Sequence, residues 1–143
     1  MYKIRRGGNN NMSENNFKEL SPCGALIMKI VWEAPGEISV QELIDQLNEK
    51  YQKAYARTTV VTFLSKLKDK GYIDTYRKGK PAYIVVRLTE DEYRRELLKS
   101  NVEFWYNGNT VDMIATICES QDLGKDGIAK INEILDRYSK KYE

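Results

Sequence analysis

The 143-residue chain contains no histidine, the residue that enzymes most often use as a general base. Nucleophile pairs built on an imidazole and histidine metal sites are excluded for the same reason. The sequence also lacks a glycine-rich phosphate loop and any convergent pair of carboxylates. We therefore expect no enzyme activity, no cofactor and no bound metal ion.

Cysteines and long apolar runs are scarce as well. The two cysteines, Cys23 and Cys118, lie far apart in the sequence and cannot form a zinc site alone. A cytosolic protein with two buried thiols is the simplest interpretation. No apolar run approaches the ~20 residues of a membrane span, and no secretory signal is found. We expect a cytoplasmic protein without membrane insertion.

The formal net charge of +2 says little about partners, but the charges are unevenly distributed. Between Lys50 and Lys80 there are nine Lys and Arg residues against two Asp. From Thr89 to Glu143, eight Lys and Arg residues stand against twelve Asp and Glu. A basic middle beside an acidic end indicates two parts with different surfaces. A basic stripe is typical of proteins that contact phosphate groups.

Capping signals and apolar periodicity predict helices on both sides of a β-hairpin. Ser21 and Pro22 suit the N-cap and the first position of a helix. Ser39-Val-Gln-Glu42 and Thr89-Glu-Asp-Glu92 are capping boxes that mark two further helix starts. After Gly71 the composition becomes typical of strands. The predicted helices cover residues 22–33, 40 to about 51, 56–70, 90–105, 111–119 and about 125–140, and the strands cover residues 72–77 and 82–88.

The predicted helix over residues 56–70 has two contrasting faces. Its apolar stripe, at spacings typical of a core-facing helix, consists of Val60, Phe63, Leu64 and Leu67. The opposite face carries the short side chains of Thr58, Val61, Thr62 and Ser65. Around that face lie the basic residues Arg57, Lys66, Lys68 and Lys70. This pattern suits a helix in the DNA major groove, although a solvated face with ordinary lysines is the alternative.

The neighbouring segments favour DNA binding. Three helices followed by a hairpin form a winged helix, whose tip here is Lys78-Gly79-Lys80-Pro81. We expect Arg77, Lys78 and Lys80 to contact phosphates, with solvated turn lysines as the alternative. The predicted fold is mainly α with a small β-hairpin. It comprises a disordered extension over residues 1–16, a winged helix-turn-helix domain over 17–88 and a helical dimerisation domain over 89–143.

The three C-terminal helices bury little on their own, because a module of about fifty residues is marginally stable. We therefore expect their apolar stripes to meet those of a second subunit. Folding back onto the first domain is the alternative. The residues predicted to mediate dimerisation are Leu98, Val102, Trp105, Ile114, Ile128, Ile131 and Leu135.

From about Leu20 to Leu135 the sequence resembles the penicillinase and methicillin-resistance repressors. The similarity lies in Met28-Lys-Ile-Val-Trp32, Thr59-Val-Val-Thr-Phe-Leu-Ser-Lys-Leu67, Lys70-Gly-Tyr-Ile73 and Tyr106-Asn-Gly108. The resemblance implies a homodimeric repressor that binds double-stranded operator DNA at an inverted repeat. By position, Thr59, Val61, Thr62 and Ser65 would face the groove, while Thr58, Lys66 and the wing would hold the backbone.

The resemblance also concerns how such a repressor is released. Family members are cleaved in the C-terminal domain after a membrane sensor signals, which makes a sensor-linked protease a candidate partner. The equivalent segment here has Ser100-Asn101 in place of the family's Asn-Phe pair. Ser100 and Asn101 are therefore only a candidate cleavage segment. A second function also stays open, in which the winged helix presents its lysine face to an acidic protein instead of DNA.

Overall fold

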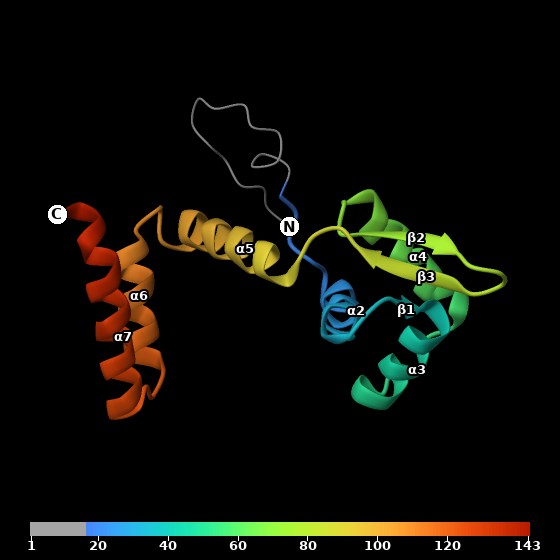
Figure 1. Ribbon diagram of the computed structural model, residues 1–143, viewed down its shortest axis with the longest axis horizontal. Helices are drawn as coiled ribbons and strands as arrows, with labels where there is room; N and C mark the ends of the chain where they lie inside the picture. Colours follow the sequence, from blue (N-terminus) through green and yellow to red (C-terminus); the bar gives the residue numbers. More distant parts are fainter. Residues whose placement is uncertain (1–16) are drawn as a thin grey trace, which may run out of the picture. The chain divides into compact units, whose positions relative to one another are not determined.

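The computed structural model describes residues 17–143, so the predicted extension over residues 1–16, with its Arg5-Arg6 pair, lies outside the described residues. The chain divides into two compact units (Figure 1). The first unit extends to Ser100, and the second comprises Asn101–Glu143. One helix, α5 (Glu90–Trp105), begins in the first unit and ends in the second.

The first unit contains three helices, a three-stranded antiparallel sheet and the start of α5. Its elements before α5 are α2 (Pro22–Glu33), β1 (Ile38–Ser39), α3 (Val40–Tyr51), α4 (Arg57–Asp69), β2 (Ile73–Arg77) and β3 (Ala82–Val86). The strand order is β1-β3-β2, with Ile38 opposite Ile84 and Ile73 opposite Val86. This is the predicted winged helix.

The core of the first unit is built from the apolar stripes of the three helices and one face of the sheet. Its fully buried side chains include Ile27, Met28, Leu43, Leu47, Val60, Ile73 and Ile84. Because i, i+3 and i+4 positions share one side of a helix, each amphipathic helix turns its apolar stripe inward. The polar face of α4 is left on the outside.

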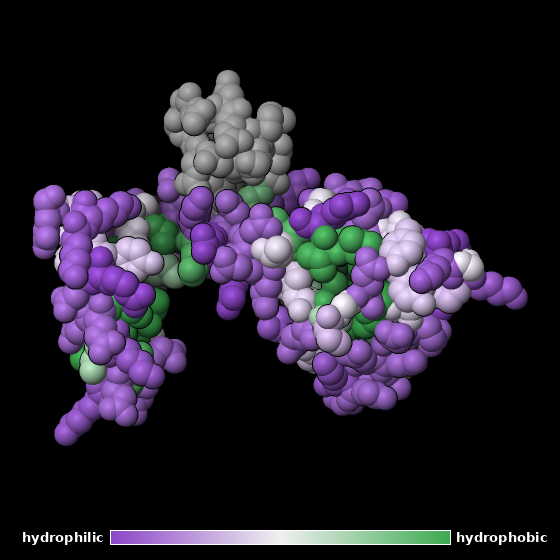
Figure 2. Space-filling view, viewed as in Figure 1, coloured by the Kyte–Doolittle hydropathy of each residue, from purple (hydrophilic) through white to green (hydrophobic). Residues whose placement is uncertain are grey.

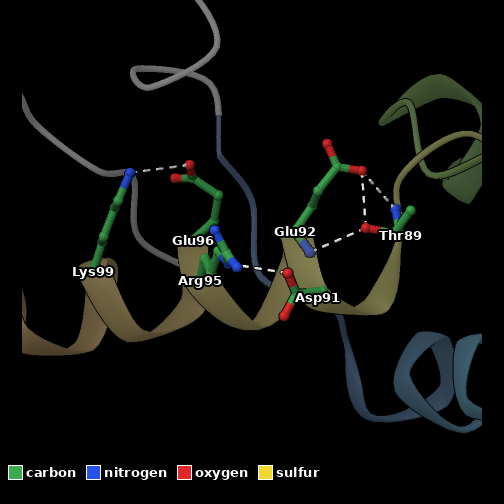
Figure 3. Close-up of polar contacts among 6 residues, drawn as sticks. All are labelled: Thr89, Asp91, Glu92, Arg95, Glu96 and Lys99. Atoms are coloured by element: carbon green, nitrogen blue, oxygen red, sulfur yellow. Dashed lines mark hydrogen bonds and ion pairs between the residues drawn. The ribbon is translucent and has the colours of Figure 1, made fainter. Parts of the chain in front are cut away.

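The predicted caps are present at the helix starts. The hydroxyls of Ser21 and Ser39 accept hydrogen bonds from the backbone N–H groups of Gly24 and Glu42, both at 3.1 Å. Thr89 and Glu92 form a reciprocal capping box (Figure 3). In it, the Thr89 N–H donates to Glu92 Oε1 at 3.0 Å and the Glu92 N–H donates to Thr89 Oγ1 at 3.1 Å. These bonds satisfy N–H groups that lack a partner within the helix.

The first turns of α5 are attached to the winged helix by an aromatic cluster. The Tyr93 ring lies 5.6–5.8 Å, centroid to centroid, from the rings of Phe17, Trp32 and Tyr72. Trp32 Nε1 donates to the carbonyl of Leu88 at 2.9 Å. Burial raises the pKa of Tyr72, whose hydroxyl donates to the Lys18 carbonyl. The start of α5 is therefore part of the first unit's core.

The second unit contains the end of α5, then α6 (Thr110–Ser120), α7 (Gly124–Ser139) and a short 3-10 turn, η1 (Lys140–Tyr142). None of the residues in α6 or α7 is fully buried. Figure 2 shows apolar side chains of this unit at the surface. Among the described residues, no helix is both long enough and apolar enough to cross a membrane.

Two expectations fail at the level of the fold. Strand β1 was not predicted, because a strand of two residues shows no periodicity in the sequence. The prediction of two buried thiols is wrong: Cys23 is half-buried and Cys118 is exposed. Cys23 lies near the start of α2 and contacts the Tyr55 hydroxyl at 3.1 Å, and α6 has no buried position for Cys118.

Candidate nucleic-acid interface

The exposed face of α4 carries the predicted short side chains. Thr58, Val61, Thr62 and Ser65 are all exposed, with Val61 at 49%. Val60, Leu64 and Leu67 hold the other side of the helix in the core. Thr59, which the family resemblance placed toward the groove, is only half-exposed. The exposed face is thus a continuous patch of small groups, because these positions are spaced i, i+3, i+4 and i+7.

Arg57 at the start of α4 is held by a side-chain network from α3. Its Nη1 donates to Gln41 Oε1 at 2.8 Å. Gln41 Nε2 in turn donates to Asp45 Oδ1 at 3.0 Å. The network joins α3 to α4, the two helices of the helix-turn-helix, and orients the guanidinium at one end of the patch.

The wing tip is a tight basic turn. The Lys78 N–H donates to the Pro81 carbonyl at 3.1 Å, and Gly79 adopts the left-handed backbone that favours glycine, with φ of +71°. Arg77 Nη1 donates to the Lys80 carbonyl at 2.8 Å. Lys78 and Lys80 are exposed. The turn therefore presents lysine ammonium groups to solvent at the end of the hairpin.

A groove of about 440 Å³ separates α4 from the wing. Arg57, Val61 and Ser65 lie on its helix side, and Thr75 and Arg77 lie on its β2 side. The structure thus brings one edge of the patch and part of the basic wing to the same concave surface. A concave surface with cations at its borders suits a double-helical polyanion.

Lys68 differs from the other basic residues of α4. Its Nζ lies 3.5 Å from Asp74 Oδ1, and Arg87 Nη2 lies 3.3 Å from Asp74 Oδ2. The Thr75 N–H, followed by Arg87 and Lys68, holds the pKa of Asp74 below its usual value. Lys68 therefore has a carboxylate partner within the first unit, whereas Lys66 and Lys70 are exposed and form no ion pair with another residue of the range 17–143.

Sequence reasoning missed Gln41 and Asp45 as contributors to this site. They sit on α3, and Arg57 is sixteen positions away from Gln41 along the chain. A contact between two helices leaves no periodic pattern in the sequence from which it could be predicted. A glutamine four residues before an aspartate is a weak helical signal by itself.

The candidate cleavage segment and the predicted dimerisation residues lie outside this surface. Ser100 is 1% exposed and lies inside α5, and Asn101 is half-buried in the same helix. Val102 and Ile131 are half-exposed. The other predicted dimerisation residues are exposed by 46–67% and comprise Leu98, Trp105, Ile114, Ile128 and Leu135. Within residues 17–143, no three acidic or cysteine side chains gather as metal ligands.

The family model described as "Penicillinase repressor" matches residues 20–137 of this chain. The chain belongs to the penicillinase repressor family. This confirms the resemblance inferred from the motifs at Met28–Trp32, Thr59–Leu67, Lys70–Ile73 and Tyr106–Gly108. The family description is that of a repressor, not of an enzyme.

Relatives of this penicillinase repressor family member align over most of its length. The methicillin resistance regulatory protein MecI of Staphylococcus aureus (strain N315) is 23% identical over 124 residues, covering 87% of this chain and 98% of that protein. The penicillinase repressor of Staphylococcus aureus is 23% identical over 127 residues, covering 89% and 98%. The solution structure of the DNA binding domain of the repressor BlaI overlaps 54% of this chain and 94% of its own, at 21% identity and a TM-score of 0.42.

Proposed function

We propose that this protein is a DNA-binding transcriptional repressor that acts as a homodimer on an inverted-repeat operator. The observation that carries this proposal is the exposed patch on α4, formed by Thr58, Val61, Thr62 and Ser65 beside a basic wing. The family description and the names of the two staphylococcal relatives agree with such a role.

In this proposal α4 enters the major groove. The groove is about 12 Å wide and admits one α-helix, so short side chains can approach base edges while longer ones reach the phosphates. Thr58 and Lys66 are assigned to the near backbone, and Arg57 to the phosphates at the start of α4. Arg77, Lys78 and Lys80 of the wing would contact the flanking backbone. These contacts supply salt-dependent affinity without sequence information.

The exposed apolar residues of the second unit support dimerisation. Side chains such as Ile114, Ile128 and Leu135 are 46–53% exposed on amphipathic helices that bury no residue fully. Covering them with the same helices of a second copy would remove this apolar surface from water. A two-fold dimer would then read two half-sites about one helical turn apart, or a multiple of it.

Release by a sensor-linked protease is a further part of the proposal. Ser100 is buried and its peptide bond to Asn101 lies within α5. Proteases bind extended backbone, so cleavage there would require this part of α5 to unwind first. Limited proteolysis of free and DNA-bound protein, followed by mass spectrometry, would locate the cut.

The test of DNA binding is a mobility shift on the promoter of the chain's own gene. We expect specific retardation, with log affinity falling linearly with log salt concentration. Lys80→Ala should weaken binding to all sequences alike and reduce the salt slope by about 1. Lys130→Ala on α7 is the matched control and should leave both unchanged. Salt-insensitive or absent binding would instead favour the protein-contact alternative.

A further inference from the structure

We infer that α4 selects its operator half-site through the 5-methyl groups of thymine, which Val61 and Thr62 contact in the major groove. This inference rests on the proposed function and specifies which chemical groups of the DNA that function recognises. Three observations support it: the hydrogen bond made by Thr62, the exposure of Val61, and the contacts that hold the neighbouring long basic side chains.

The hydroxyl of Thr62 is not free to donate. Thr62 Oγ1 donates its hydrogen to the backbone carbonyl of Thr58, one turn earlier, at 3.0 Å. The oxygen therefore presents only lone pairs to a bound base, and the side chain adds a methyl group beside it. Such a group accepts from the exocyclic amine of adenine or cytosine but cannot donate to guanine O6 or N7.

Val61 is an apolar, β-branched side chain on a solvent-exposed helix face, with 49% of its surface accessible. Packing accounts for only part of this choice, since half of the Val61 surface stays accessible beside Val40 and Ala82. Helix propensity does not account for it either, because valine is a poorer helix former than the polar residues common on exposed faces. It lines the groove between α4 and the wing together with Ser65. Its methyl groups can be covered by an apolar group of the ligand, and thymine is the base that offers one in the major groove.

Three long basic side chains around the groove have contacts within the protein. Arg57 donates to Gln41 at 2.8 Å, Arg77 donates to the Lys80 carbonyl at 2.8 Å, and Lys68 lies 3.5 Å from Asp74. The central positions 58, 61, 62 and 65 contain no arginine, lysine, asparagine or glutamine. The patch therefore lacks the side chains that read guanine or adenine with paired hydrogen bonds.

One A·T pair supplies both groups that this surface can recognise. Thymine offers its methyl to Val61 or to the methyl of Thr62, and the adenine of the same or the next pair offers its amine to Thr62 Oγ1. The expected half-site is accordingly rich in A·T pairs at the centre of the α4 footprint. Cytosine in place of thymine removes the methyl group while keeping a pyrimidine.

The experiment replaces thymine by deoxyuracil, which lacks only the 5-methyl group. The full-length protein is bound to the best duplex selected from a random library, and each thymine of a half-site is exchanged in turn. We expect affinity to fall about fourfold for each contacted methyl group, with no change at the other thymines. A non-specific duplex with the same exchanges controls for changes in the DNA itself.

Variants of α4 link the effect to these two residues. Val61→Ala and Thr62→Ser should each reduce the loss of affinity caused by deoxyuracil at one thymine position. Thr62→Val should leave that loss unchanged, because it keeps a methyl group, but should remove the preference for the paired adenine. Thr116→Ser is the matched control, because Thr116 Oγ1 on α6 of the second unit makes the same bond to the Asp112 carbonyl at 3.0 Å. Circular dichroism confirms that each variant is folded.

The outcomes separate this inference from the function on which it rests. Specific binding that is insensitive to uracil would overturn thymine reading and leave the repressor proposal standing. A uracil effect that is unchanged in both Val61→Ala and Thr62→Ser would also overturn it, because other residues would then read the methyl groups. Absence of any selected sequence above non-specific binding would instead count against the repressor proposal itself.

Discussion

Among single residues, Arg57 of the proposed interface is held by two side chains of another helix. Gln41 and Asp45 lie on α3, yet they determine where the guanidinium of Arg57 points. Both bonds are exposed, so each contributes little to the free energy of unfolding. In the proposed interface they contribute to affinity, because an oriented arginine loses less side-chain entropy when it meets a phosphate.

Gln41→Ala tests this positioning role. We expect a three- to tenfold loss of operator affinity, an unchanged sequence preference, and a free energy of unfolding within about 0.5 kcal/mol of the parent. Fluorescence anisotropy and urea titration measure the two quantities. Gln46→Ala on the same helix is the control, since within residues 17–143 the Gln46 side chain makes no hydrogen bond to α4. Equal affinity losses in the two variants would show that Gln41 has no special role.

At the scale of elements, the capping box of α5 determines where this helix begins. The backbone N–H of Thr89, followed by its hydroxyl, lowers the pKa of Glu92 below its usual value (Figure 3). A carboxyl with a lowered folded-state pKa stabilises the fold above its unfolded pKa, near 4.5. That stabilisation is lost as the pH falls through the lower, folded-state pKa.

Thr89→Ala and Glu92→Gln separate the cap from its charge. Thr89→Ala should lower the free energy of unfolding by ~1 kcal/mol at pH 7, because an N-cap hydroxyl is lost. Glu92→Gln keeps a capping side chain that does not titrate, so stability should fall less steeply below pH ~4.5 than in the parent. Urea titrations between pH 7 and pH 3 measure both. If the stability of Glu92→Gln depends on pH as in the parent, Glu92 does not contribute to the loss of stability in acid. Glu90 and Asp74, whose pKa values are also lowered, contribute to that loss as well.

Most elements were predictable because their signals are local. The helix over Pro22–Glu33 was predicted with its bounds, and α4 was predicted to within one residue at each end. The N-cap residue, the apolar stripe and the terminating glycine of a helix are all close together in the sequence, so they can be recognised without knowing the fold. Strand β1 was missed because its pairing partner, β3, follows more than forty residues later. A two-residue strand exists only through that pairing.

At the scale of the whole molecule, the apolar faces of the second unit predict self-association. Leu135→Asp should shift the protein toward monomer and weaken operator binding without altering α4. Ala129→Asp, on the polar side of α7, adds the same charge and should leave both properties unchanged. Sedimentation should give twice the 16.6 kDa chain mass for the parent and for Ala129→Asp. A parent protein that is monomeric at micromolar concentration would contradict the inverted-repeat mechanism.

The helices, their caps, the inward stripes and the small-residue face of α4 could be predicted from the chain alone, because each of these depends on residues within a few positions of one another. Which basic side chains are held by partners became visible only in the folded structure. Arg57 with Gln41 and Lys68 with Asp74 join different elements. It also showed the Tyr93 cluster that makes the start of α5 part of the first unit. Sequence periodicity indicates which side of a helix or strand is buried. A contact between two elements depends instead on how those elements pack against each other in the folded protein.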